Sequence, residues 1–276
     1  MNYDRRTMLR QSLAGSALLL ASAAKAQSQP PSKEPTTNWG GPDADVPHLT
    51  LRSMVFQSKR LDATTAQYRK WYIEEHGPDY VAVAGPYLER YSRMFVEKAH
   101  MEPVDFDCVS ELALRSREAG EQNMKALDSP EWKASVAKHP KPGTKPGPNE
   151  AHNGKHRFSV DERLLSGQPR GYDPQGLRKQ IVLTRRAADL DAEAYLHALW
   201  KYGSDIARDR KDEVQRLVLN MAVPDPKREA PMYDAVYLIW PNKDANLAPA
   251  FDQPPKGVQI VNVVDVVTYE PDLGAL

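Results

Sequence analysis

The chain has little cysteine and lacks the short motifs that mark several large enzyme classes. Cys108 is the only cysteine among 276 residues, which excludes an intrachain disulfide and a cysteine-rich metal or iron–sulfur centre. The sequence contains no GxGxxG, GxxxxGKS, GxxxxGKT, GxSxG or CxxCH pattern. A dinucleotide-binding fold, a P-loop, a serine nucleophile elbow and covalently attached haem are therefore not indicated. We expect no cofactor and no bound metal.

The chain also lacks an excess of charge of one sign. It has 37 basic and 37 acidic residues, and residues 1–26 hold four of the bases and one of the acids. The remainder therefore has about three more acids than bases, which argues against nucleic acid and against an anionic membrane surface as partners. The apolar run from Leu13 to Ala24 is about half the length that a membrane-spanning helix needs.

Residues 1–26 have the pattern of a Tat-type signal peptide. The pair Arg5-Arg6 precedes a weakly apolar stretch, and Ala24-Lys25-Ala26 offers small residues for cleavage before Gln27. An ordinary Sec signal or an uncleaved anchor is the alternative. We expect export by the Tat machinery, a periplasmic location and no membrane association after cleavage. Residues 27–47 are rich in Pro, Ser, Gly and Thr, which predicts a flexible leader.

The rest of the chain contains two similar series of elements. Apolar spacing and capping signals predict the order β-α-β-β-α-β over residues 48–165. The predicted strands are 48–56, 88–96, 106–114 and 158–165, with helices at 62–75, capped by Asp62, and from 128 onward. After a linker, 166–177, a second and degenerate copy occupies residues 178–276. Its predicted strands are 179–184, 214–223, 232–240 and 258–269, with a helix at 191–210 and a short or absent second helix.

The two copies can be aligned residue by residue. Tyr68 matches Tyr195, and Phe106-Asp107-Cys108-Val109 matches Tyr233-Asp234-Ala235-Val236. The same aromatic-Asp pair at the same place in both halves indicates a tandem repeat. On this alignment His76 falls opposite Gly203, so we expect one site in each chain, in the first half.

The strongest candidate for chemistry lies in the segment 68–80. Tyr68, Tyr72 and His76 are four residues apart and share one helix face, and Gly77-Pro78 is expected to end the helix directly after the histidine. The helix dipole would then favour the imidazolium form while burial would disfavour it, which predicts a pKa near neutrality for His76. The alternative is a structural histidine that satisfies the carbonyl groups freed at the proline.

These motifs resemble the EthD family of dimeric α/β-barrel domains. The likeness rests on Tyr68, Tyr72, His76-Gly77-Pro78 and Phe106-Asp107-Cys108-Val109, and on the helix start at 129–132. The family's usual Trp at the middle position of the stripe is Tyr72 here, with Trp71 beside it. The resemblance implies an α+β fold in which two ferredoxin-like βαββαβ halves form an intrachain barrel, and association into a homodimer stays open. It also implies action on a small aromatic or hydrophobic molecule.

We therefore expect a cofactor-independent enzyme of the lyase, dehydratase or isomerase type, with His76 as general acid–base. The alternatives are a non-catalytic binding or accessory protein of a catabolic pathway and, third, an oxygenase or haem-type barrel enzyme. Asp107 would orient His76, although its repetition as Asp234 favours a structural register contact. The expected catalytic residues are His76, Tyr72 and Asp107, and the expected substrate-binding residues are Tyr68, Trp71 and Tyr91.

Two further features carry weaker hypotheses. His152 and His156 are four residues apart, but the intervening Asn153-Gly154 predicts a turn, so a surface loop is favoured over a metal site. The proline- and glycine-rich stretch 138–148 reads as a linker or as a lid over the cleft, and the linker is favoured.

Overall fold

The computed structural model describes residues 48–150, 156–168, 173–223, 230–242, 245–271 and 273. The first half consists of β1 (His48–Gln57), α2 (Thr65–Trp71), the π turn η1 (Tyr72–His76), α3 (Gly77–Ala84), η2 (Gly85–Tyr87), β2 (Leu88–Ala99), β3 (Cys108–Leu114), α4 (Arg117–Ala126), α5 (Pro130–Lys138) and β4 (Arg157–Ser166). The second half consists of β5 (Arg178–Arg186), α6 (Ala192–Asp209), β6 (Val214–Val223), β7 (Ala235–Pro241), the short 3₁₀ helix η3 (Ala248–Phe251) and β8 (Val258–Tyr269).

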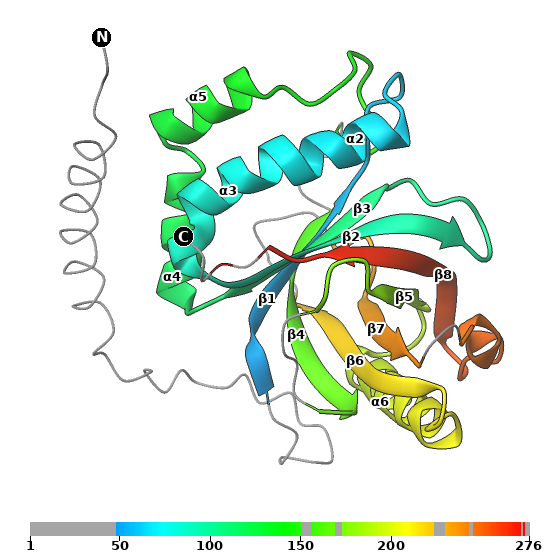
Figure 1. The fold of residues 1–276 in the computed structure, drawn as a ribbon. Helices are drawn as coiled ribbons and strands as arrows, with labels where there is room; N and C mark the ends of the chain where they lie inside the picture. Colours follow the sequence, from blue (N-terminus) through cyan, green and yellow to red (C-terminus); the bar gives the residue numbers. More distant parts are fainter. Residues whose placement is uncertain are drawn as a thin grey trace, which may run out of the picture. The chain divides into compact units, whose positions relative to one another are not determined.

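All eight strands close into one antiparallel barrel in the order β1-β3-β2-β8-β5-β7-β6-β4 (Figure 1). Each half contributes four strands in the ferredoxin-like order, β4-β1-β3-β2 and β8-β5-β7-β6. The halves join at two equivalent seams, β2 with β8 and β4 with β6. The predicted fold class, two ferredoxin-like halves in an intrachain dimeric α/β barrel, is confirmed.

The barrel interior is filled with side chains rather than open. One core cluster draws on all eight strands, as only inward-facing residues can, and includes Phe56, Met94 and Leu238. Arg52 also points inward and pairs with Glu111 and, at 3.0 Å, with Glu162. Both carboxylates are fully buried, so the interior combines an apolar core with paired charges.

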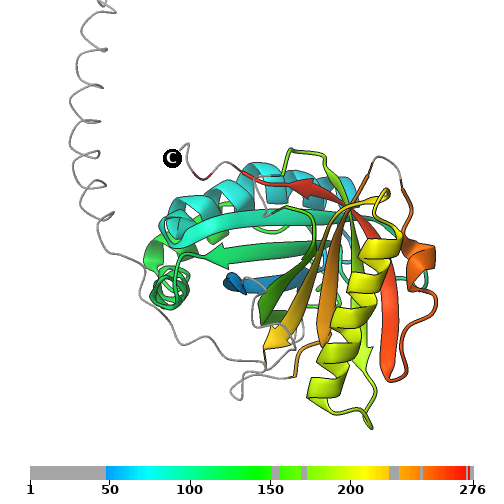
Figure 2. The same ribbon diagram turned by 90° about the horizontal axis from the view of Figure 1, so that it is seen from below.

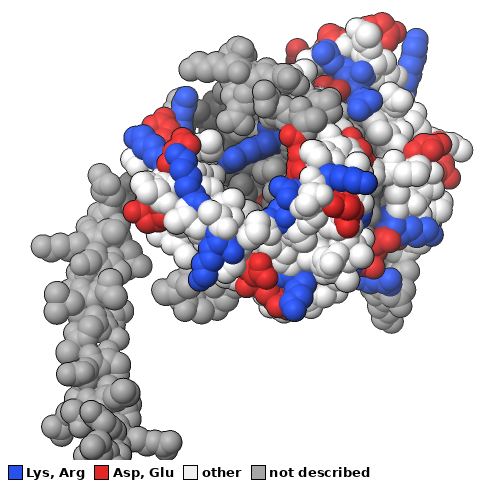
Figure 3. All heavy atoms as spheres, turned by 90° about the horizontal axis from the view of Figure 1, so that it is seen from above, with Lys and Arg blue, Asp and Glu red and all other residues white. Residues whose placement is uncertain are grey.

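Helices cover the outside of the sheet. In Figures 1 and 2, α2 to α5 lie on the outer face of the first half, and α6 lies on the outer face of the second half. Two outer core clusters lie beneath α2 and α3, and one lies beneath α6 and η3. None of the described helices is both long and apolar enough to cross a membrane. On the face that Figure 3 shows, the acidic and basic side chains of the described residues are interspersed.

Equivalent contacts recur in the two halves. The hydroxyl of Tyr68 donates to Gln57 at 3.5 Å, and that of Tyr195 lies 2.8 Å from the hydroxyl of Thr184. Gln57 pairs with the first residue of β3, and Thr184 pairs with the first residue of β7. The matched tyrosines therefore make equivalent hydroxyl contacts at the same point of each half.

The helix that carries the tyrosine stripe does not end at Gly77-Pro78, contrary to the prediction. It passes from α2 through the π turn η1 into α3 and continues to Ala84. The wider turn, in which the N–H of Gly77 bonds to the carbonyl of Tyr72, makes room for a proline that has no N–H of its own. His76 is thus inside a continuous helical path and not at a C-terminus, so the dipole argument does not apply to it.

The π turn also shifts the correspondence between the halves by one residue. The N–H of Gly77 bonds to the carbonyl of Tyr72, five residues earlier. Leu199 is the equivalent of Tyr72 in the second half, and in the regular α-helix α6 the N–H four residues after it is that of Gly203. Gly77 and Gly203 therefore correspond, and both lie too close to the sheet for a Cβ. The alignment of His76 with Gly203 was wrong by one position, although the second half still has no matching histidine.

Two other local predictions need correction. Thr64, not Asp62, caps the first helix, since its side chain accepts the N–H of Gln67 in a capping box. Asp62 instead accepts the backbone N–H groups of Thr144 and Lys145, which fixes the proline-rich loop against the start of the helix. Helices α3 and α4 were not predicted.

Candidate functional site

The π turn places His76 in an aromatic enclosure outside the barrel. Its ring stacks on Trp71 with centroids 4.6 Å apart, lies 5.1 Å from Tyr72 and meets the edge of Trp132 at 5.5 Å. Trp71 ends α2 and Tyr72 begins the π turn η1. Trp132 comes from α5, which packs against α3. No hydrogen bond within the described part of the chain engages either ring nitrogen of His76. Contacts with the rings of Trp71, Tyr72 and Trp132 therefore orient the imidazole.

This environment holds His76 in its neutral form. Burial, and next the positive charge of Arg93, lowers the pKa of His76 from 6.5 to about 4, against a smaller opposing effect of Asp79. The predicted pKa near neutrality is not what the structure gives, because burial and the Arg93 cation lower the pKa and the helix continues past His76. A neutral imidazole can accept a proton at pH 7, as a general base must.

Tyr68 and Tyr72 lie between the helix and the outer face of the sheet, and both are almost fully buried. The hydroxyls of Tyr72 and Ser110 are 2.6 Å apart. Burial raises the pKa of both tyrosines well above 10, so both are phenols that can donate a hydrogen bond but cannot act as bases. Burial likewise raises the pKa of the neighbouring Cys108 to about 12, which excludes a thiolate nucleophile.

Arg93 on β2 is the most unusual residue of the site. Its side chain is 1% exposed, yet no carboxylate of the described chain pairs with it. Its guanidinium lies over the rings of Tyr269, Tyr91 and Tyr72 at 4.3, 5.0 and 5.7 Å, and it donates to the Tyr72 carbonyl, while its Nε has no partner. Aromatic faces offset part of the desolvation of this cation, but they do not neutralise it.

The remaining predicted residues fall into two groups. Trp71 and Tyr91 belong to the site: Trp71 donates to the carbonyl of His139, and Tyr91 packs under Arg93 and against Tyr80 at 4.9 Å. Asp107 does not join them, because its carboxylate accepts the backbone N–H of Lys59 at 2.8 Å.

Asp107 has the same role as its counterpart in the second half. Asp234 accepts the backbone N–H of Arg186, also at 2.8 Å, and each aspartate directly precedes the strand β3 or β7. No hydrogen bond or ion pair of the described residues joins Asp107 to His76. The geometry thus matches the register contact that the repetition of this residue suggested.

Three residues of the site were missed in the sequence. Arg93 lies between Tyr91 and Phe95 on the outer face of β2, and Ser110 lies between Cys108 and Leu112 on that of β3. Since β2 also carries Glu89, Arg90, Glu97 and Lys98, its sequence does not single out Arg93. Trp132 stands in the Ser-Pro-Glu-Trp helix start, but nothing in the sequence places it over His76. Its position depends on how α5 packs against α3.

Helix α5 and the loop after it form the outer wall of the site. The imidazole of His139 pairs with Asp79 on α3 at 2.6 Å. Lys141 donates to the Ser58 carbonyl and pairs with Glu150, and its ammonium group lies 5.5 Å from the centroid of the Tyr68 ring. The segment 138–148 thus packs on the site through polar contacts. No residue of α5 itself is fully buried.

No group of three or more His, Cys, Asp or Glu among the described residues could hold a metal ion. His100 pairs with Asp265, and His156 lies 3.2 Å from the sulfur of Met232. His152 lies outside the described residues. His76 is not among the residues that line either of two cavities in the described part of the chain.

The fold and the site define the chain as a single-chain dimeric α/β-barrel protein. It matches no protein-family model, and no curated protein matches its sequence. Its fold is similar to that of an anthrone oxidase-like protein, at 13% identity and a TM-score of 0.44 over 81% of this chain and 93% of that one.

Two further structures are similar at the same level. A heme-binding protein from Thermus thermophilus has 9% identity and a TM-score of 0.43, over 81% of this chain and 92% of that one. A variant of chlorite dismutase from Candidatus Nitrospira defluvii has 12% identity and a TM-score of 0.42, over 79% and 90%. Such distant likeness concerns the fold alone, and the resemblance to the EthD family stays a prediction.

Proposed function

We propose that this protein is a cofactor-independent enzyme of the lyase, dehydratase or isomerase type. Its substrate is a small aromatic molecule with an acidic group, a carboxylate or a phenol. The observation that carries the proposal is the buried, unpaired guanidinium of Arg93 beside the neutral imidazole of His76. An anion is the ligand that this cation lacks, and aromatic rings are the surface that surrounds it.

The chemistry follows from the two groups together. For a carboxylate substrate, neutral His76 takes a proton from the carbon next to the carboxylate, and the freed electron pair moves onto a carboxylate oxygen. Arg93, which pairs with that carboxylate, stabilises the added negative charge. The imidazolium returns the proton at another carbon, which gives isomerisation, or to a departing hydroxyl group, which gives dehydration. Tyr72 would hold the substrate oxygen by donating its phenolic proton.

Binding of an anion would also prepare the base. Arg93 is the second cause of the low pKa of His76. When a carboxylate neutralises Arg93, that cause is removed and the pKa of His76 rises, which makes the imidazole a stronger base only while substrate is present. A ligand that reaches the imidazole of His76 must displace Trp132 of α5, whose ring edge contacts it.

The test measures binding of phenylacetate, phenylethanol and phenylethylamine to the purified protein together with the histidine proton resonances. We expect phenylacetate to bind best at this site, to raise the pKa of His76, and to lose at least tenfold in affinity in Arg93→Met. The proposal fails if phenylacetate binding is unchanged in Arg93→Met. Tyr195→Phe in the second half is the matched control and should bind as wild type does.

A non-catalytic binding or accessory protein is the second candidate, and one observation favours it. Tyr68 and Tyr72 already have protein partners for their hydroxyls, so a ligand beside them would be held by packing alone. His76→Ala separates the two functions. An enzyme loses turnover of its substrate and keeps binding, whereas a binding protein shows no turnover in the wild type and keeps its affinity in the variant.

We also propose that the protein works in the periplasm of a cell that degrades aromatic compounds, after export by the Tat machinery. The twin arginine Arg5-Arg6 supports this. Replacing both with lysine should retain the protein in the cytoplasm, and unimpaired export of that variant would contradict Tat transport.

A further inference from the structure

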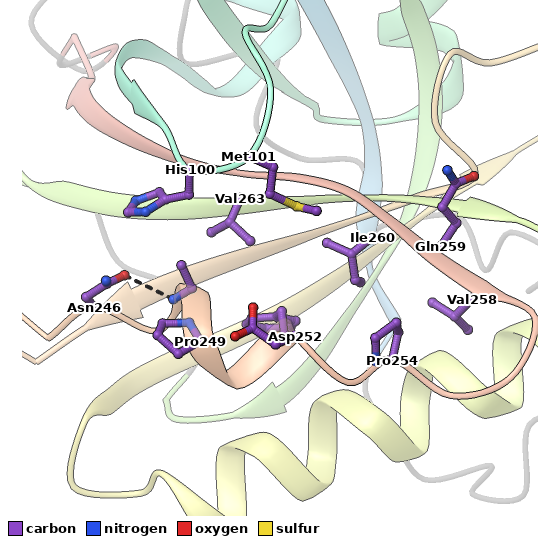
Figure 4. Close-up of a pocket in the computed structure, with 12 residues that line it drawn as sticks. His100, Met101, Asn246, Pro249, Asp252, Pro254, Val258, Gln259, Ile260 and Val263 are labelled. Atoms are coloured by element: carbon purple, nitrogen blue, oxygen red, sulfur yellow. Dashed lines mark hydrogen bonds between the residues drawn. The ribbon is translucent and has the colours of Figure 1, made fainter.

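A cavity lies mainly on the second half of the chain, and none of its lining residues belongs to the site around His76. It is a groove of about 610 Å³ between η3, the outer face of β8 and the loop that follows β2 (Figure 4). The groove exists because the second half crosses from β7 to β8 with the four-residue η3, where the first half has both α4 and α5. Its volume is within the range of small-molecule sites.

The floor of the groove is apolar and is part of the outer core. Phe251, Val258, Ile260 and Val263 line it and belong to the cluster beneath α6 and η3. Met101, which is 58% exposed, stands at the mouth. A flexible thioether above an apolar floor suits a ligand with an aromatic or aliphatic body.

Hydrogen bonds fix both walls of the groove. On one side, the backbone N–H of His100 donates to the Val263 carbonyl at 2.9 Å, and that of Met101 donates to the side chain of Asn262 on β8. The imidazole of His100 is in turn held by Asp265 at 2.8 Å.

On the other side, Gln180 accepts the N–H of Leu247 and donates to Asn246 and to Asp265, so η3 is tied to the same network. A cavity with walls held this way needs little reorganisation to bind a ligand.

The charge of the lining points to the class of ligand. Asp252 lines the groove and contributes a carboxylate, and no Lys or Arg is among the lining residues. In Figure 4 the Asp252 side chain points into the space below Met101 and Val263. Asp252 has no ion-pair partner in the described chain. The polarity is opposite to that of the Arg93 site.

We infer that this groove is a second binding site, which takes a small aromatic or aliphatic amine. The ammonium group pairs with the carboxylate of Asp252, and the apolar body lies on Phe251, Ile260 and Val263. The site does not depend on His76 or Arg93, so it stands or falls separately from the proposed enzymatic activity.

The experiment titrates the purified protein with phenylethylamine, phenylethanol and phenylacetate by saturation-transfer NMR, at low salt. We expect a Kd on the order of 1 mM for phenylethylamine. Asp252→Asn, an isosteric change at an exposed position, should weaken the amine about fivefold and leave phenylethanol unchanged. Ala248→Trp, which fills the groove, should weaken both at least tenfold.

The matched control is Ala194→Trp, a bulky residue at an exposed position of α6, which should bind as the wild type does. The inference is overturned if phenylethylamine binds equally to wild type, Asp252→Asn and Ala248→Trp, or if wild type binds neither amine nor alcohol. A protein dimer that Ala248→Trp dissociates, without amine binding, would assign the groove to a second copy of the chain and also overturn it.

Discussion

A guanidinium buried without a carboxylate partner is unfavourable for folding, and Arg93 is such a group. The guanidinium contacts three tyrosine rings and one carbonyl oxygen, and these interactions offset only part of the free energy lost when it leaves water. Residues that destabilise the fold in this way are frequently those that function requires. The environment of Arg93 is therefore more informative than that of the tyrosines, whose hydroxyls have protein partners.

Replacing Arg93 with methionine should stabilise the protein while weakening phenylacetate binding at least tenfold. Methionine fills a similar volume and carries no charge to desolvate, so we expect the free energy of unfolding to rise by about 1–2 kcal/mol. Urea denaturation of both proteins measures this. Arg52→Met is the contrasting control, because Arg52 is buried with Glu111 and Glu162 and its loss leaves two carboxylates inside the barrel. A marked loss of stability in Arg93→Met would contradict the assignment.

His76 should make stability depend on pH in a predictable direction. Its pKa is about 4 in the folded protein and 6.5 unfolded, so between these values the unfolded chain binds more protons. Stability from this group is complete above pH 6.5 and declines as the pH falls toward 4. The loss between pH 7 and pH 5 should be about 2 kcal/mol. In His76→Gln the difference between urea midpoints at the two pH values should shrink accordingly, and an unchanged difference would show that His76 is not neutralised by its surroundings.

At the scale of secondary-structure elements, the repeat provides internal controls. Asp107 and Asp234 each accept one backbone N–H at the strand start, at the same distance. Asp107→Ala and Asp234→Ala should therefore destabilise by similar amounts, about 1–2 kcal/mol each, because each loses one charged acceptor. Thermal or urea unfolding compares them. If Asp107→Ala also removed an activity that Asp234→Ala preserves, beyond what stability explains, the shared structural role would be incomplete.

The strands were predictable and the helical irregularities were not. Apolar residues located the eight strands to within a few residues, because they alternate where one face is buried and run on where both faces are. Gly77-Pro78 predicted a helix end, yet packing on Arg93 and the sheet continues the helix through a π turn. Tertiary contacts there outweigh the local tendency of Gly-Pro to end a helix. The extra residue of the π turn shifts the correspondence between the two halves by one position, which an alignment of their sequences does not show.

The candidate site shows the same division. The stripe of Tyr68, Tyr72 and His76 could be predicted from spacing alone, and the structure brings these residues together. The partners that define their chemistry come from elsewhere in the chain, Arg93 from β2 and Trp132 from α5. Helix spacing specifies a face but not what packs against it, so the low pKa of His76 could not be foreseen.

At the scale of the barrel, the two halves are mutually dependent. β2 and β4 are the edge strands of the first half, and each is covered only by a strand of the second half. An isolated half would expose two unpaired edges and half of an interior core. The fold thus achieves within one chain what a dimer of identical halves would achieve with two.

A fragment of residues 48–166 tests this dependence. β8 occupies in the second half the place that β4 occupies in the first, so the β2–β8 seam shows how β2 of one fragment can pair with β4 of another. We expect the fragment to associate, with two copies forming two such seams, because pairing removes both exposed edges at once. Light scattering after size-exclusion chromatography gives the mass. A folded monomer would contradict the requirement for seam partners. In such a monomer Arg93, which lies on β2 opposite Tyr269 of β8, would have lost one of its three aromatic contacts without unfolding the chain.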